Sequence, residues 1–86
     1  MINNPAICIP RLPEKNTTKE LIKNTFIKYQ LGLIDKIDIF NNKAFIYFKY
    51  WNKDARAQSI KNRMLNGETL NFIYNTPWFW KCSIKK

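Results

Sequence analysis

Apolar and polar residues alternate most regularly over Lys43–Trp51, which reads KAFIYFKYW. Side chains of a β-strand point alternately to its two faces. One face is expected to carry rings between cations, with Lys43, Phe45, Tyr47, Lys49 and Trp51. The other suits a hydrophobic core, with Ala44, Ile46, Phe48 and Tyr50. The stretch therefore predicts a strand with one face buried and one face presented to a ligand.

Two further strands and a turn surround this stretch. Ala6–Ile9 is a short apolar run that ends at a proline, and Leu33–Phe40 has a period of two. In the latter, Ile37 and Ile39 are expected on one face, and Lys36, Asp38 and Phe40 on the other. Asn41–Asn42 then predicts a tight hairpin, because asparagine tolerates positive φ.

Two helices are predicted from the 3.6-residue period. The first begins at a capping box of Thr17 and Glu20, and Gly32 is expected to end it. Its apolar stripe comprises Leu21, Ile22, Thr25, Phe26 and Tyr29. The second covers Ala55–Leu65, capped by Asn52 or Asp54 and stopped at Asn66–Gly67.

The last segment predicts a short strand or hairpin arm from Leu70, a break at Asn75–Pro77, and a final strand that includes Trp80 and Cys82. The resulting order is β-α-β-β-α-β in one domain over residues 1–86. This order is typical of a ferredoxin-like α+β sandwich, a four-stranded antiparallel sheet with two helices on one face. The first and third strands are then the middle ones, and Cys8 is expected on the uncovered face beside Phe45.

Composition narrows the class of partner. Fifteen Lys and Arg against six Asp and Glu give a net charge of +9, which favours a polyanion such as RNA or single-stranded DNA. Two cysteines and no histidine indicate free thiols, no metal site and no cofactor. Cys8 and Cys82 are expected on opposite faces of adjacent strands, which prevents a disulfide. The absence of a long apolar run or signal-like start predicts an intracellular protein with no membrane partner.

Asn41–Phe48 and Ile7–Leu12 carry a family resemblance. Ala44–Phe48 fits the last five places of the longer signature of the RNA recognition motif (RRM), although Lys43 stands where that family has a ring. Ile7–Leu12 resembles its shorter signature, with Cys8 in place of the ring. Nearly the whole chain is similar to small RRM-like proteins of large DNA viruses, through ICIPR, LGLIDKIDIF, FIYFKYWN and NTPWFWKC. The resemblance implies a viral protein with an RRM-like fold, located in the cytoplasm or nucleus of the host cell.

These patterns predict a nucleic-acid-binding module, with single-stranded RNA as the expected ligand and low sequence specificity. Phe45 and Tyr47 are the stacking candidates. The other candidate binding residues are the cations Lys43, Lys49, Arg11 and Lys81, together with Cys8 and Phe79. The alternative is a protein-interaction or homo-oligomerisation domain that uses the same face or the cluster Trp78–Phe79–Trp80. Within this cluster, a structural role in the core is favoured for Trp80.

An enzyme is not expected. Acylphosphatases share the sandwich, but their phosphate-binding loop contains glycine, whereas Pro10–Asn16 has no glycine and two prolines. The chain also has no histidine and no evident pair of carboxylates for acid–base catalysis.

Overall fold

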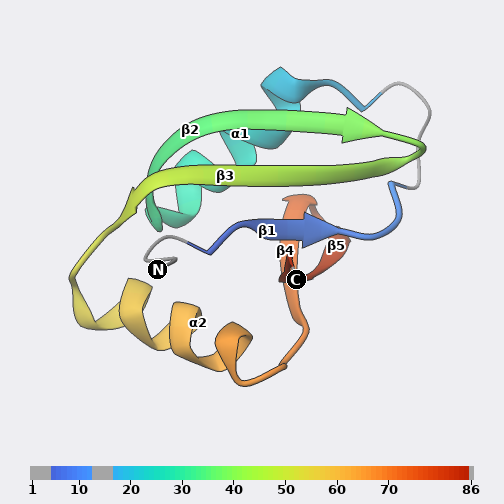
Figure 1. The fold of residues 1–86 in the computed structure, drawn as a ribbon. Helices are drawn as coiled ribbons and strands as arrows, with labels where there is room; N and C mark the ends of the chain where they lie inside the picture. Colours follow the sequence, from blue (N-terminus) through green and yellow to red (C-terminus); the bar gives the residue numbers. More distant parts are fainter. Residues whose placement is uncertain (1–4, 13–16, 86) are drawn as a thin grey trace.

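The computed structural model describes residues 5–12 and 17–85. It is an α+β protein, as predicted, with two helices and five strands (Figure 1). In chain order the elements are β1 (Ile7–Ile9), α1 (Lys19–Tyr29), β2 (Gly32–Phe40), β3 (Lys43–Trp51), α2 (Ala55–Leu65), β4 (Leu70–Asn75) and β5 (Trp78–Ile84). Neither helix in the described ranges has the length and apolar character needed to span a membrane.

The prediction of a four-stranded sheet is wrong, because the sheet has five strands in the order β2-β3-β1-β5-β4. The neighbouring strands are all antiparallel. The segment expected as a short strand or hairpin arm is the added strand, since β4 pairs with β5 from Leu70–Cys82 to Asn75–Trp78. The first and third strands are adjacent, as predicted, and β1 is the middle strand of the five. Figure 1 shows β4 and β5 behind β1 and running across its direction, so the sheet is strongly twisted.

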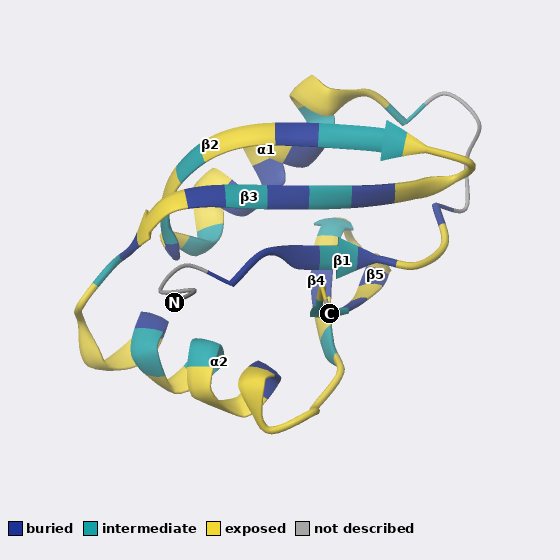
Figure 2. Cartoon of the chain, viewed as in Figure 1, coloured by how far each residue is buried: buried dark blue, intermediate teal, exposed yellow. Residues whose placement is uncertain are grey.

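One hydrophobic core joins both helices to the sheet. Ile22 and Phe26 of α1 and Met64 of α2 belong to the same buried cluster as Ile7 of β1 and Ile46 of β3. Burial alternates along β3, where Figure 2 shows dark, buried segments between less buried ones. The rings of Phe26 and Phe72 lie 5.0 Å apart, which ties α1 to the edge strand β4.

The helix ends follow the predicted chemistry, with two shifts. Thr18, not Thr17, caps α1, because its hydroxyl accepts a hydrogen bond of 3.1 Å from the Leu21 amide. The helix ends at Gln30, which adopts the left-handed conformation with φ of 54°. Gly32 is therefore not the cap. It begins β2, where a Cβ would lie 2.1 Å from the Tyr50 carbonyl oxygen, so the close approach of two strands explains the glycine.

The second helix is as predicted. Asp54 caps α2, with its carboxylate accepting a hydrogen bond of 3.2 Å from the Ala57 amide. The helix covers Ala55–Leu65 and ends at Asn66, and Gly67 follows with φ of 96°. Asn41 and Asn42 have φ of 51° and 63°, which confirms the predicted hairpin turn between β2 and β3.

An irregularity in β3 overturns the predicted faces of its last residues. The register shifts between the pairs Leu33–Tyr50 and Ile34–Phe48, so β3 contains one extra residue there. Beyond the shift, Tyr50 is 53% exposed and Trp51 is 4% exposed. Trp51 was expected on the open side of the strand, with Phe45, and Tyr50 was expected in the core. Both expectations are wrong. The indole nitrogen of Trp51 donates a buried hydrogen bond of 2.9 Å to the Pro5 carbonyl.

Candidate nucleic-acid interface

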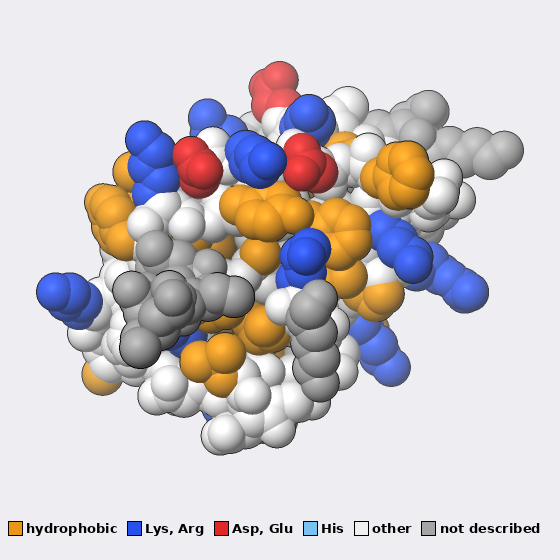
Figure 3. Space-filling model, in the orientation of Figure 1, with side chains coloured by type: hydrophobic (Ala, Val, Ile, Leu, Met, Phe, Trp, Pro, Cys, Tyr) orange, Lys and Arg blue, Asp and Glu red, His pale blue; other side chains and the backbone are white. Residues whose placement is uncertain are grey.

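The sheet side chains that alternate with the buried ones form a surface, here called the open face. On β3 it includes Lys43, Phe45 and Tyr47, which alternate with buried Ala44, Ile46 and Phe48. The other strands and the residue that follows β5 contribute Cys8, Lys36, Asp38, Phe40, Phe79, Lys81, Ser83 and Lys85. Figure 3 shows hydrophobic side chains gathered in the middle of the molecule in this view, with basic side chains on and around them.

A row of directly paired residues crosses the middle of the open face. Asp38 of β2 pairs with Phe45 of β3, Phe45 pairs with Cys8 of β1, and Cys8 pairs with Ser83 of β5. Tyr47 follows two residues along β3, opposite Lys36. The structure therefore brings together three residues predicted from the sequence, Cys8, Phe45 and Tyr47, on the two adjacent strands β1 and β3.

Two lysines lie over the half-buried rings of Phe45 and Tyr47. The Lys36 ammonium nitrogen is 5.0 Å from the centre of the Tyr47 ring, and that of Lys85 is 5.8 Å from the centre of the Phe45 ring. Both distances are within the range of cation–π attraction. Neither lysine was among the predicted binding residues. The alternation of Lys81, Ser83 and Lys85 with buried Trp80 and Cys82 was the signal that could have found Lys85.

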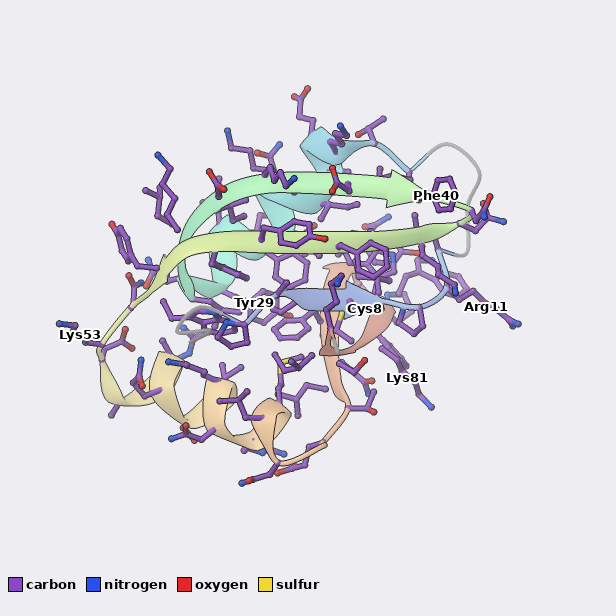
Figure 4. All side chains as sticks on the ribbon, in the orientation of Figure 1. Cys8, Arg11, Tyr29, Phe40, Lys53 and Lys81 are labelled. Atoms are coloured by element: carbon purple, nitrogen blue, oxygen red, sulfur yellow. The ribbon has the colours of Figure 1, made fainter. Side chains whose placement is uncertain are left out.

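The predicted phosphate-binding cations fall into two groups. The Leu12 amide donates a 2.7 Å hydrogen bond to the Asn42 carbonyl, so Arg11 lies near the β2–β3 turn and Lys43. Figure 4 shows Arg11 and Lys81 extending from this same end of the sheet, far from Lys53. Lys49 belongs to the opposite end of β3, at the register shift. The structure thus groups Arg11, Lys43 and Lys81 and leaves Lys49 apart.

Acidic groups concentrate on one side. The Lys36 ammonium nitrogen lies 3.8 Å from a carboxylate oxygen of Asp38, and both side chains are on β2. In Figure 3 the acidic side chains lie toward β2 and α1, whereas the lower half of the view is free of visible acidic atoms. Among the open-face residues named above, the one carboxylate belongs to Asp38 of β2, whereas β3, β1 and β5 contribute no carboxylate and include the cations Lys43 and Lys81.

The two cysteines lie on opposite faces and are both free thiols, as predicted. Cys82 is buried in the core, and its burial raises the pKa of the thiol far above the ordinary value. Cys8 is half-buried on the open face. Burial raises the pKa of the Cys8 thiol, while Lys43 and Lys85 act in the opposite direction. Among residues 5–12 and 17–85, no group of three or more His, Cys, Asp or Glu side chains is placed to hold a metal ion.

The predicted aromatic cluster at Trp78–Trp80 is divided between core and surface. Trp80 is 1% exposed and stacks on Tyr74 with ring centres 4.3 Å apart. Trp78 and Phe79 are 62% and 45% exposed, and Phe79 pairs directly with exposed Ile73 of β4, whereas Trp78 pairs with Asn75. Ile73, Trp78 and Phe79 are here called the hairpin patch. They are separate from the two rings of Phe45 and Tyr47, here called the Phe45–Tyr47 platform. Phe79 is thus on the open face by alternation, but at the far end of β5 from Ser83.

Part of the loop considered for phosphate binding, residues 13–16, lies outside the described residues. The flanking Pro10, Arg11 and Leu12 are described, and of these Leu12 is buried against the core. No catalytic geometry is therefore assigned to this loop.

Comparisons of the chain with known proteins found no relative. No family model matches the chain, and no curated protein and no solved structure is significantly similar to it. The resemblance to the RNA recognition motif stays a prediction. A function must accordingly be argued from the residues of the open face and their surroundings.

Proposed function

We propose that this protein binds single-stranded nucleic acid, with RNA as the expected class, through its open face. One observation carries the proposal: Phe45 and Tyr47 lie two residues apart on β3, and each has an ammonium group over its ring. Neither ring is enclosed by the core. The chain as a whole carries a net charge of +9.

Stacking supplies more free energy than the existing ring contacts. A base stacked on an aromatic side chain contributes about 1–3 kcal/mol. A cation–π contact at an exposed site contributes about 0.5–1 kcal/mol. A bound strand is therefore expected to displace Lys36 from Tyr47 and Lys85 from Phe45. Each displaced ammonium then lies within reach of the phosphates on either side of the stacked base.

The backbone of the strand is held by the cations at one end of the sheet. Arg11, Lys43 and Lys81 are exposed and have no carboxylate partner among the ion pairs of the described residues. Contacts from these side chains to phosphates carry no sequence information. Affinity without strong sequence preference is the expected outcome for most of the surface.

We infer that the domain is an RRM-like sandwich with one added strand. Four of its strands, in the order β2-β3-β1-β5, keep the neighbours that the sequence predicts for a sandwich of this class. The added strand β4 lies outside β5, at the edge. The Phe45–Tyr47 platform then occupies an inner strand of the sheet, where single-stranded RNA is bound in this class of domain.

Fluorescence anisotropy with a labelled oligouridylate of about ten nucleotides, at about 50 mM salt, tests the proposal. The double variant Phe45→Ala/Tyr47→Ala is expected to bind at least about tenfold more weakly. Ile27→Ala is the matched control, since Ile27 is an exposed apolar residue on α1. No binding by the wild type, or equal binding by the double variant, would overturn the proposal.

The hairpin patch favours a second candidate function, a protein-interaction or self-association surface. Ile73, Trp78 and Phe79 are each at least 45% exposed, and exposed tryptophan is a frequent centre of protein interfaces. Size-exclusion chromatography with light scattering tests self-association. A dimer that Trp78→Ala/Phe79→Ala converts to a monomer would support this candidate, and a monomeric wild type would remove self-association.

A further inference from the structure

A pocket opens beside the row of paired residues on the open face. Its volume is about 320 Å³. Two of its residues, Cys8 and Ser83, are members of that row and pair directly across β1 and β5. The lining as a whole comprises Cys8, Met64, Gly67, Ser83, Ile84 and Lys85, and it is here called the Cys8 pocket.

The pocket lies next to the principal stacking ring. Cys8 pairs directly with Phe45, and neighbouring strands are about 4.8 Å apart. Lys85 lines the pocket, and its ammonium nitrogen is also 5.8 Å from the centre of the Phe45 ring. A base that stacks on Phe45 therefore places its neighbour, or its own edge, at the mouth of the pocket.

The polar side chains of the pocket are biased toward hydrogen-bond donors. The Lys85 ammonium group only donates, and the Ser83 hydroxyl donates or accepts. The Cys8 thiol is half-buried, and its S–H group is a weak donor. Among the residues that the structure describes, none with a side-chain carboxylate lines the pocket. A ligand group with an oxygen acceptor suits this lining, whereas an amino group would face the Lys85 ammonium donor to donor.

The apolar part of the lining favours a flat ring over a free phosphate. Met64 and Ile84 contribute apolar groups, and Gly67 presents backbone without a side chain. No heavy atom lies within 4 Å of where a Gly67 Cβ would be, so this wall is open. The volume is at the lower end of the range for ligand pockets, which fits a single ring system.

We propose, on the basis of the proposed function, that the Cys8 pocket receives one base of the bound strand and selects bases with a carbonyl oxygen on the edge. Guanine presents O6 and uracil presents O4, whereas adenine and cytosine present amino groups at the corresponding positions. A lysine donating to guanine O6 and N7 is among the commonest base-specific contacts. Lys85 and Ser83 are the specificity-determining residues in this assignment.

The discrimination against adenine and cytosine follows from a lost acceptor. An amino group in place of the carbonyl oxygen removes the acceptor that the Lys85 ammonium and the Ser83 hydroxyl would use, and leaves only a ring nitrogen beside it. Because Lys85 is exposed, the expected loss is that of the charge-assisted hydrogen bond. We therefore expect oligouridylate to bind at least about fivefold more tightly than oligocytidylate of the same length.

Two pairs of probes test the selectivity by anisotropy. The first compares oligouridylate with oligocytidylate, both pyrimidine strands of equal charge. The second compares an oligoadenylate with the same strand carrying inosine, which replaces the adenine amino group by O6. The wild type is expected to prefer uracil and inosine, and Lys85→Met is expected to bring both ratios close to one.

A matched control separates selectivity from charge. Lys43→Met removes the same charge from the open face outside the pocket, so it is expected to weaken all four strands equally and keep the ratios. Ser83→Val suits a β-strand, removes the hydroxyl and narrows the pocket, so it is expected to reduce the ratios as well. Circular dichroism verifies that each variant is folded.

The outcomes distinguish this inference from the proposed function. Equal binding of uracil and cytosine strands by the wild type, or unchanged ratios in Lys85→Met, would refute the base-selective pocket. The proposed function would still stand if Phe45→Ala/Tyr47→Ala weakened all strands. If the wild type bound none of the four strands, the proposed function itself would fail.

Discussion

The ammonium nitrogen of Lys36 lies 5.0 Å from the centre of the Tyr47 ring. Its carboxylate neighbour Asp38 is 3.8 Å away and pairs with Phe45 across the two strands. The Lys36–Asp38 ion pair thus lies on the edge strand β2, directly beside Tyr47 and Phe45 of β3. Its position makes the Asp38 charge the acidic group closest to the platform along the sheet register.

Removing that carboxylate should strengthen nucleic-acid binding. Asp38→Asn leaves the size of the side chain nearly unchanged, and we expect about two- to fivefold tighter binding at low salt, because exposed charge pairs contribute about 0.2–1 kcal/mol. Anisotropy titrations at low and high salt measure the gain, which should shrink as salt rises. Asp35→Asn makes the same change in net charge in the pocket between α1 and β2, and an equal gain there would contradict a local effect.

Binding should depend on salt through specific lysines. For single strands, the logarithm of the binding constant falls with the logarithm of salt concentration by about 0.7 per neutralised phosphate. Lys43→Ala is therefore expected to reduce the slope by about 0.7. Lys23→Ala, an exposed lysine of α1, should leave it unchanged. Equal slopes for the two variants would remove Lys43 from the phosphate contacts.

The two glycines should respond differently to the same substitution. Gly32→Ala forces a Cβ to 2.1 Å from the Tyr50 backbone oxygen, so we expect a loss of about 3 kcal/mol or more in the free energy of unfolding. At Gly67 there is space, but φ is +96°, so the expected cost is only about 1–2 kcal/mol. Urea denaturation of both variants measures the difference. A larger loss at Gly67 would contradict the close strand approach at Gly32.

Alkaline pH should destabilise the fold through Cys82. Burial raises the pKa of this thiol in the folded protein above its ordinary value of 9.0, so above that pH the unfolded chain binds fewer protons than the folded one. The stability that the protonated Cys82 thiol contributes is fully present below the pKa of this thiol in the unfolded chain. It is lost as the pH rises toward the pKa of the thiol in the folded protein. The contribution to the free energy of unfolding therefore falls by about 1.4 kcal/mol per pH unit.

Urea titrations from about pH 8 to about pH 10.5 measure this fall. Cys82→Ala is expected to decline less steeply than the wild type. Cys8→Ala should resemble the wild type more closely, because Cys8 is only half-buried and Lys43 and Lys85 counter the effect of burial on its pKa. Parallel pH curves for all three proteins would be inconsistent with a buried, protonated Cys82.

Local chemistry made the helices and the central hairpin predictable. Asp54 and the pair Asn41–Asn42 act through their own backbone neighbours, so their roles are visible in the sequence. The role of Gly32 depends instead on the Tyr50 backbone, which is eighteen positions away and brought near only by the sheet. Gln30 takes the left-handed cap position, which propensity alone would have given to the glycine.

The candidate site was predictable where alternation is regular. Phe45, Tyr47 and Cys8 lie together because period two holds over the middle of β3 and β1. The period fails at the register shift near Lys49, and Trp51 consequently turns into the core. The Cys8 pocket combines residues from β1, α2 and β5, and no local pattern reports such a combination. Strand β4 was predicted only as a short strand or hairpin arm and was not counted in the sheet, because its alternation is weak.

Strand β1 has three residues, yet it holds the two halves of the sheet together. Its partners are Ala44–Ile46 and Ser83–Ile84, so its contacts connect the most distant parts of the chain. The β2–β3 and β4–β5 hairpins can close locally and rapidly, whereas the pairing of β1 with β5 joins residues far apart in the chain. During synthesis, the aromatic strand would therefore exist before the row through Cys8 and Ser83 is complete. The row of paired residues on the open face is therefore expected to be completed only when β5 pairs with β1.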